Sequence, residues 1–111
     1  MRCAIDALMS VKTSGRHIAV LADMLELGRF SADEHFKIGL YAAAKKVAAI
    51  LLTGAEARHI QAGIGSAAPV SHFDNKNMLI AHLKEFIKAG DVLLIKGSRG
   101  MKMEDVAEAL R

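Results

Sequence analysis

The hydrophobic positions along the chain alternate between two kinds of pattern. Short runs of consecutive, mostly branched apolar residues occur at Arg16–Leu21, Val47–Thr53, Val70–Phe73 and Val92–Ile95. These runs are too short for ordinary helices and show no strict period of two, which is typical of strands covered on both faces of a parallel sheet. We therefore predict four buried strands.

Between these runs, apolar residues recur at the spacing of amphipathic helices. The expected helices are an opening one with Met1, Ile5, Leu8 and Met9 on one face, one running to about Lys46 with Phe36, Gly39, Leu40, Ala43, Ala44 and Val47, a short one from Ala55 to Gly63, one with Leu79, Leu83, Phe86 and Ile87, and a closing one with Met103, Val106, Ala107 and Leu110. Strands and helices thus alternate, which predicts an α/β fold: a mostly parallel, doubly wound, Rossmann-like sheet with helices on both faces.

Local signals predict where several helices begin and end. The spacing of Ser31 and Glu34 predicts a capping box at the start of the second helix. Asp74 or Asn75 is expected to cap the fourth helix, and Ala89–Gly90 to end it. The opening helix lacks a capping residue, which predicts a first strand upstream of this sequence.

Composition narrows the class of protein. The chain has 111 residues, of which 52% are apolar, enough for one domain with a single core. No apolar stretch approaches the roughly 20 residues that span a bilayer, so we predict no contact with a membrane. Cys3 is the only cysteine, which excludes an internal disulfide and favours a reducing, cytoplasmic compartment.

The charge pattern argues against a nucleic-acid partner. The formal net charge is +3, but lysines and arginines are scattered among acidic residues along the whole chain, and aromatic residues make up only 5%. A nucleic-acid interface more often shows a basic stripe with interleaved aromatics. A small anionic ligand needs only a local cluster of cations, such as Lys96 and Arg99.

Three loops are candidates for a ligand site. In doubly wound sheets ligands bind outside the carboxyl ends of the strands, and the loops Ala22–Gly28, Thr53–Glu56 and Lys96–Gly100 follow three of the predicted strands. The third loop combines cations, a glycine and a helix start, which suits an anion. Ordinary turn chemistry explains the same residues equally well, so both interpretations stay open.

Other chemistry finds little support in the sequence. No glycine-rich dinucleotide fingerprint follows a strand, and no Walker motif occurs. Asp23 and Glu26 follow a strand closely enough to form a metal or general-base pair, but a turn role for Asp23 and a solvated Glu26 are the favoured interpretation. None of the five histidines shows zinc-ligand spacing, although His35 lies near the predicted ligand edge. We predict no catalytic residue and no metal ligand in this chain.

Several motifs occur together in a specific order. Ala22–Gly28 (ADMLELG) comes first, followed by His35, Val92–Arg99 (VLLIKGSR) and Met103–Val106. This combination resembles the C-terminal domain of the Mur ligase family over essentially the whole chain. Two positions depart from the family pattern, because Ala22 stands where the family has Gly and Gly100 stands where it commonly has Ser.

The resemblance implies one substrate-binding, C-terminal domain, residues 1–111, of a three-domain bacterial enzyme. It implies an ATP-dependent amide ligase of peptidoglycan precursor synthesis, most similar to the members that join D-alanyl-D-alanine to UDP-N-acetylmuramoyl-tripeptide through an acyl phosphate. ATP and Mg²⁺ would be bound mainly by the central domain. This domain would position the dipeptide and close over the site beside the N-terminal and central domains, and would be inactive alone.

The resemblance also implies a set of substrate-binding residues. These are Asp23, Glu26, Gly28, His35, Thr53, Glu56, Lys96, Gly97, Ser98 and Arg99. A stand-alone, non-catalytic, flavodoxin-like interaction domain remains the main alternative, in which the charged loops are merely solvated. A small nucleotide-binding module is disfavoured by the missing glycine fingerprints.

Overall fold

The computed structural model describes residues 1–110, except for the side chain of Glu26. The elements are α1 (Arg2–Ser10), β1 (His17–Ala22), η1 (Leu25–Phe30), α2 (Ser31–Ala44), β2 (Ala49–Thr53), α3 (Ala57–Ile64), β3 (Val70–Phe73), α4 (Lys76–Phe86), β4 (Val92–Lys96), η2 (Arg99–Met101) and α5 (Glu104–Ala109). Every predicted strand and α-helix is therefore present in this part of the chain. The two 3₁₀ helices, η1 and η2, have no counterpart in the sequence prediction.

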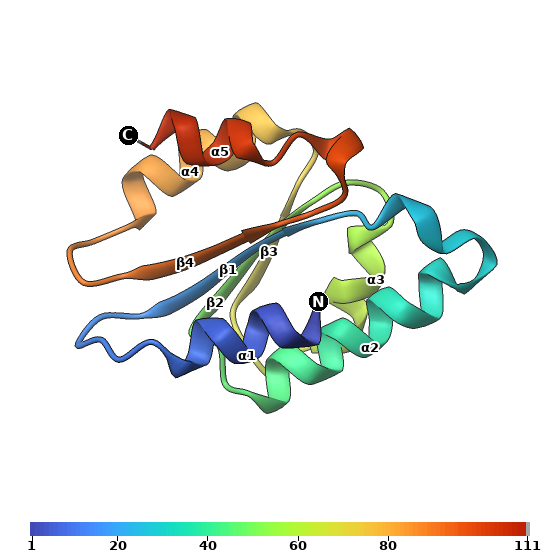
Figure 1. Ribbon diagram of the computed structural model, residues 1–111, viewed down its shortest axis with the longest axis horizontal. Helices are drawn as coiled ribbons and strands as arrows, with labels where there is room; N and C mark the ends of the chain where they lie inside the picture. Colours follow the sequence, from blue (N-terminus) through green and yellow to red (C-terminus); the bar gives the residue numbers. More distant parts are fainter. Residues whose placement is uncertain (111) are drawn as a thin grey trace.

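The strands form one parallel sheet in the order β3-β2-β1-β4. Helices α1, α2 and α3 cover one face, and α4 and α5 cover the other (Figure 1). This arrangement confirms the predicted doubly wound α/β fold. Because all four strands run in the same direction, their carboxyl ends meet at one edge of the sheet, which brings the loops after β1, β2 and β4 together.

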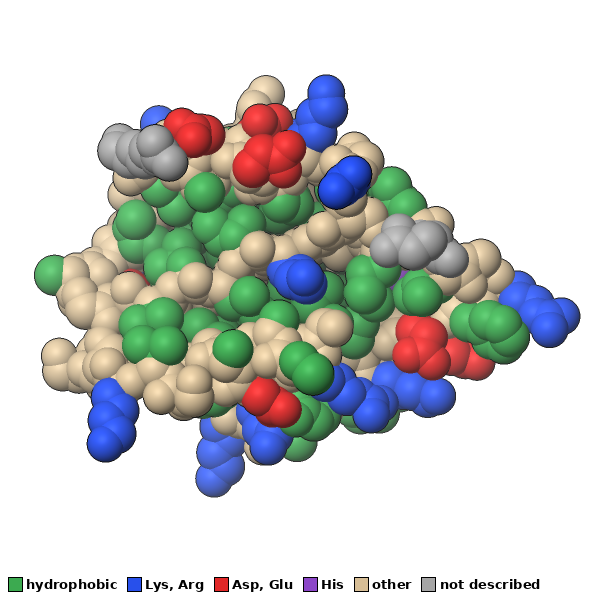
Figure 2. Space-filling view, viewed as in Figure 1, with side chains coloured by type: hydrophobic (Ala, Val, Ile, Leu, Met, Phe, Trp, Pro, Cys, Tyr) green, Lys and Arg blue, Asp and Glu red, His purple; other side chains and the backbone are tan. Residues whose placement is uncertain are grey.

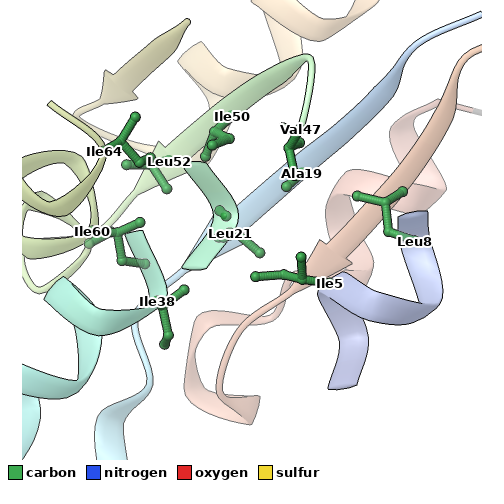
Figure 3. Packing of buried hydrophobic residues seen from close by; sticks show 12 residues of the cluster. Ile5, Leu8, Ala19, Leu21, Ile38, Val47, Ile50, Leu52, Ile60 and Ile64 are labelled. Carbon is green, nitrogen blue, oxygen red and sulfur yellow. The ribbon is translucent and has the colours of Figure 1, made fainter. Parts of the chain in front are cut away.

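The core lies on both faces of the two central strands. Every residue of β2 is buried, as are Ile18–Ala22 of β1. Figure 3 shows the cluster under α1, α2 and α3, which includes Ile5, Leu8, Leu21, Ile38, Ile50, Leu52, Ile60 and Ile64. The edge strands are less covered, since no residue of β3 or β4 is fully buried.

Helices α2 and α3 are in close backbone contact at two glycines. A Cβ atom on Gly39 would lie 2.2 Å from the carbonyl oxygen of Ile60, and one on Gly63 would lie 2.2 Å from that of Phe36. The predicted apolar face of α2 was partly wrong, because Phe36 and Leu40 are exposed. The buried positions instead include polar Ser31 and His35, whose hydrogen bonds allow them to face the core.

Two of the predicted helix ends were wrong and one was right. Ser31 lies inside the first turn of α2 and does not cap it; its hydroxyl donates to Glu56 Oε1 at 2.5 Å. Asn75 caps α4, since its side-chain oxygen accepts the N–H of Met78 at 2.9 Å. Helix α4 ends at Phe86, and Gly90 (φ +91°) belongs to the turn before β4.

One side of β4 has no neighbouring strand among the described residues. Figure 2 shows hydrophobic side chains around this strand, in keeping with the half-buried state of Val92–Ile95. Helix α1 contacts both β4 and β1, and a right-handed connection through α1 would place a preceding strand beyond β4. The strand expected upstream stays a prediction.

None of the helices within residues 1–110 has the length and apolar character needed to cross a membrane.

An ion pair at the opposite edge of the sheet holds the turn before β4. Arg16 Nη2 lies 2.6 Å from Asp91 Oδ2, and Arg16 Nε donates to Asp91 Oδ1 at 3.2 Å. The backbone N–H of Lys88 donates to the same carboxylate at 2.8 Å. These bonds, above all those from Arg16, hold the pKa of Asp91 well below its usual range.

This ion pair predicts a specific dependence of stability on pH. A depressed pKa in the folded state adds stability above the unfolded pKa of about 3.9, and this stability is lost as the pH falls below it. Asp91→Asn should therefore lower the Tm at pH 7 and flatten the fall in Tm between pH 5 and pH 3. Thermal unfolding monitored by circular dichroism measures both effects.

Asp74→Asn is the matched control, because Asp74 is exposed and lies 3.6 Å from Arg58 in a pair open to solvent. This variant should change the Tm at pH 7 by only a degree or two. An acid-dependent loss of stability in Asp91→Asn as steep as in the parent chain would contradict the role given to Asp91.

Candidate functional site

The loops after β1 and β4 lead to opposite faces of the sheet. The chain passes from β1 through η1 to α2 on one face, and from β4 through η2 to α5 on the other. A crevice between such diverging connections is the usual ligand site of this architecture. On the β4 side of this crevice is a hollow of about 310 Å³, lined only by residues from the end of β4 to α5: Ile95, Lys96, Gly97, Ser98, Arg99, Met103, Glu104 and Ala107.

The rim of the hollow carries two cations and one carboxylate. Lys96, Arg99 and Glu104 are exposed, and none of their side chains forms an ion pair within the described part of the chain. A guanidinium at this place can bind a carboxylate through two parallel hydrogen bonds, and an ammonium can meet a carboxylate or a phosphoryl oxygen. The hollow is therefore suited to a small ligand with an anionic group.

Backbone bonds tie the two diverging loops together at the base of this crevice. The N–H of Leu25 donates to Ser98 Oγ at 2.7 Å. The N–H of Ser98 donates to the carbonyl oxygen of Asp23 at 3.0 Å. Ser98, the residue before Arg99, is thus held close to the start of η1.

The carboxylate of Asp23 connects a third loop to this pair. Asp23 is 5% exposed, and its Oδ1 accepts the N–H of Ala57 at 2.7 Å, at the first residue of α3. Gly54 makes room for it: a Cβ there would lie 2.3 Å from the same oxygen, and its φ of +107° favours glycine. The turn role favoured for Asp23 on sequence grounds was therefore wrong as to place, because its carboxylate bonds to the start of α3, at the end of the loop after β2, and not within its own turn.

Three more of the implied site residues use their polar atoms inside the domain. His35 is fully buried and accepts the N–H of Met24 at Nε2, 3.0 Å away. Thr53 is buried and donates to the carbonyl oxygen of Phe73 at 3.0 Å. Glu56 accepts the hydroxyl of Ser31. These side chains hold the loops in place in the described structure.

The implied site residues therefore divide into two groups. Lys96, Gly97, Ser98 and Arg99 line the hollow, whereas Asp23, His35, Thr53 and Glu56 are outside its lining and form hydrogen bonds within the domain. Gly28 has φ +55° and open space around it. The side chain of Glu26 lies outside the described residues. Whether each residue binds substrate stays a prediction.

Sequence reasoning missed two features of the site. Glu104 lines the hollow although it was quoted only as part of the Met103–Val106 motif. The backbone N–H of Met24 donates to His35 in α2, and that of Leu25 donates to Ser98 in the loop after β4; no sequence signal identifies such donors. Among the described residues, no three His, Cys, Asp or Glu side chains are placed to hold a metal ion.

The chain matches a known family over most of its length. Residues 1–99 match the family described as "Mur ligase, glutamate ligase domain". The chain belongs to the Mur ligase family. The resemblance inferred from the two loop motifs is therefore confirmed.

Curated relatives within the Mur ligase family share one name. The UDP-N-acetylmuramoyl-tripeptide–D-alanyl-D-alanine ligase of Bacillus subtilis is 33% identical over 113 residues, covering 99% of this chain and 25% of the relative. The ligase of the same name from Escherichia coli is 34% identical, covering 100% of this chain and 24% of the relative. The chain spans about a quarter of the length of these bacterial relatives.

Solved structures give the same result. One crystal structure of MurF from Acinetobacter baumannii aligns with a TM-score of 0.87 and 26% sequence identity, covering 99% of this chain and 25% of that one. A second aligns with a TM-score of 0.84 and 25% identity. The fold of this Mur ligase chain is thus found within MurF.

The side chain of Ala22, where the family pattern has glycine, allows a test of loop packing. A Cβ on Gly97 would lie 2.9 Å from the Cβ of Ala22 and 3.0 Å from Cγ of Met103. Gly97→Ala should therefore destabilise the domain by about 1–3 kcal/mol through overpacking. Ala22→Gly in the same chain removes the first contact and should restore part of that loss.

Urea unfolding of the two single variants and the double variant measures the coupling between the positions. We expect the loss of unfolding free energy in the double variant to be smaller than the two single losses added together. Strictly additive losses would show that Ala22 and Gly97 do not compete for the same space.

Proposed function

We propose that this chain is the substrate-binding C-terminal domain of a three-domain, ATP-dependent ligase of the bacterial cytoplasm. The parent enzyme would join D-alanyl-D-alanine to UDP-N-acetylmuramoyl-tripeptide. Membership of the Mur ligase family, the shared name of the curated relatives and the quarter of their length that the chain spans all support this proposal.

The observation that carries the proposal is the hollow at the carboxyl end of β4, which has Lys96 and Arg99 in its lining. D-alanyl-D-alanine has a carboxylate at one end and the reacting amine at the other. Arg99, with Lys96 beside it, would hold the carboxylate, so that the amine is directed away from the sheet toward the neighbouring domain. Binding in a fixed orientation lowers the entropic barrier to the attack of the amine.

The remaining residues would shape the site rather than perform chemistry. Gly97 brings the backbone close to Ala22, and Ser98 links the two loops. Asp23, Thr53 and Glu56 would support the loops that frame the dipeptide, and Glu26 and Gly28 would lie in the loop that faces it. ATP with Mg²⁺, held mainly by the central domain, would supply the phosphoryl group that activates the tripeptide carboxylate.

Substitution of Arg99 in the parent enzyme tests the proposal. Arg99→Ala removes a charge-assisted hydrogen bond of about 1.5–3 kcal/mol, which corresponds to roughly a 10- to 100-fold rise in the KM for D-alanyl-D-alanine. The KM for ATP should change by less than about 3-fold. Arg99→Lys should fall between, because lysine keeps the charge and loses the paired geometry.

Lys84→Ala is the matched control, since Lys84 is an exposed cation in the last turn of α4, outside the lining of the hollow. It removes the same formal charge and should leave both KM values unchanged. Equal effects of Arg99→Ala on the two substrates, or no effect on either, would contradict the role of Arg99.

A further inference from the structure

A fully buried histidine lies between α2 and the loop that follows β1. His35 Nδ1 is 2.7 Å from the carbonyl oxygen of Ser31, and its Nε2 is 3.0 Å from the backbone nitrogen of Met24. A carbonyl oxygen only accepts, so Nδ1 carries the hydrogen. Nε2 is then the acceptor for the N–H of Met24, and both ring nitrogens are used.

The segment that His35 holds is also held from the opposite side. Leu25 follows Met24, and its N–H donates to Ser98 Oγ. Ser98 in turn donates its own N–H to the carbonyl oxygen of Asp23. Three consecutive residues, Asp23 to Leu25, thus bond alternately to the α2 side and to the loop that carries Arg99.

We propose that His35 is a positioning residue for the incoming substrate and does not touch it. His35 fixes the backbone of Met24 and Leu25, Leu25 fixes Ser98, and Ser98 sets the place of Arg99 at the rim of the hollow. This inference rests on the proposed function, in which Arg99 binds the dipeptide carboxylate. This positioning role differs from the direct substrate contact that the family resemblance implies for His35, because the residue is 0% exposed.

Substitution of His35 by asparagine or by glutamine distinguishes the roles of its two ring nitrogens. Asparagine places a nitrogen near the position of Nδ1 and can keep the bond to Ser31, but it has no atom at the position of Nε2. Glutamine reaches the position of Nε2 and can accept the N–H of Met24. His35→Asn therefore breaks the connection to the loop, and His35→Gln can restore it.

The kinetic test uses the full-length parent enzyme. His35→Asn should raise the KM for D-alanyl-D-alanine about 5- to 20-fold and change the KM for ATP by less than about 3-fold. In the His35→Gln enzyme, the dipeptide KM should lie within about 3-fold of the parent value. Ser98→Ala interrupts the same connection and should show the same split. The double variant His35→Asn with Ser98→Ala should be impaired by less than the product of the single effects.

Amide hydrogen exchange of the same enzymes gives a reading that does not depend on activity. His35→Asn should speed exchange at Met24 and Leu25, while the capped amide of Met78 at the start of α4 stays unchanged. Unchanged exchange at Leu25, or a glutamine variant as impaired in dipeptide KM as the asparagine variant, would overturn the positioning role.

The two proposals fail in different ways. An Arg99→Ala enzyme with an unchanged dipeptide KM would overturn the proposed function, whatever the exchange data show at Leu25. If His35→Asn does not fold, Ser98→Ala decides, because it interrupts the connection at its other end. Unchanged exchange at Leu25 and an unchanged dipeptide KM in that variant would overturn the positioning role.

Discussion

Asp23 is the residue on which the arrangement of the site depends. Asp23 directly follows β1. Its backbone carbonyl accepts the N–H of Ser98, and its buried carboxylate accepts the N–H of Ala57. These partners lie in the loops after β4 and β2. A single residue therefore fixes three loops relative to one another, and the low exposure of its carboxylate keeps water from competing for the bond to Ala57.

The polar residues at this edge of the sheet are divided between support and recognition. The polar groups of Asp23, His35 and Glu56 bond to other parts of the domain, whereas Lys96, the last residue of β4, and Arg99, the first residue of η2, are exposed. With the supporting side chains already held by hydrogen bonds, the side-chain entropy lost on binding a ligand would come mainly from the exposed cations themselves. In the proposed function, this division would let a short loop in a small domain present an oriented anion site.

Sequence patterns predicted the features that depend on local chemistry. The apolar runs identified all four strands, and Asn75 was one of two expected caps for α4. Features that depend on distant partners were not predictable in this way. Ser31 looked like a cap, but its hydroxyl bonds to Glu56, 25 residues away. The turn containing Gly90 is set by Asp91 and Arg16.

The same distinction applies to the site. The position of the loops followed from the parallel order of the strands, and the cationic loop was visible as Lys96–Arg99. The sequence did not predict the hydrogen bond of His35 inside the domain. Its partner is the backbone N–H of Met24, just before the 3₁₀ helix η1, and no side-chain pattern predicts a bond to a backbone group there.

The most direct measurement is a crystal structure of the parent enzyme with D-alanyl-D-alanine bound. We predict that the dipeptide carboxylate lies within hydrogen-bonding distance of the Arg99 guanidinium, while His35 still accepts the N–H of Met24 and Asp23 still accepts that of Ala57. A dipeptide whose carboxylate is held elsewhere, or whose binding draws the side chain of His35 or Asp23 onto the ligand, would contradict this account.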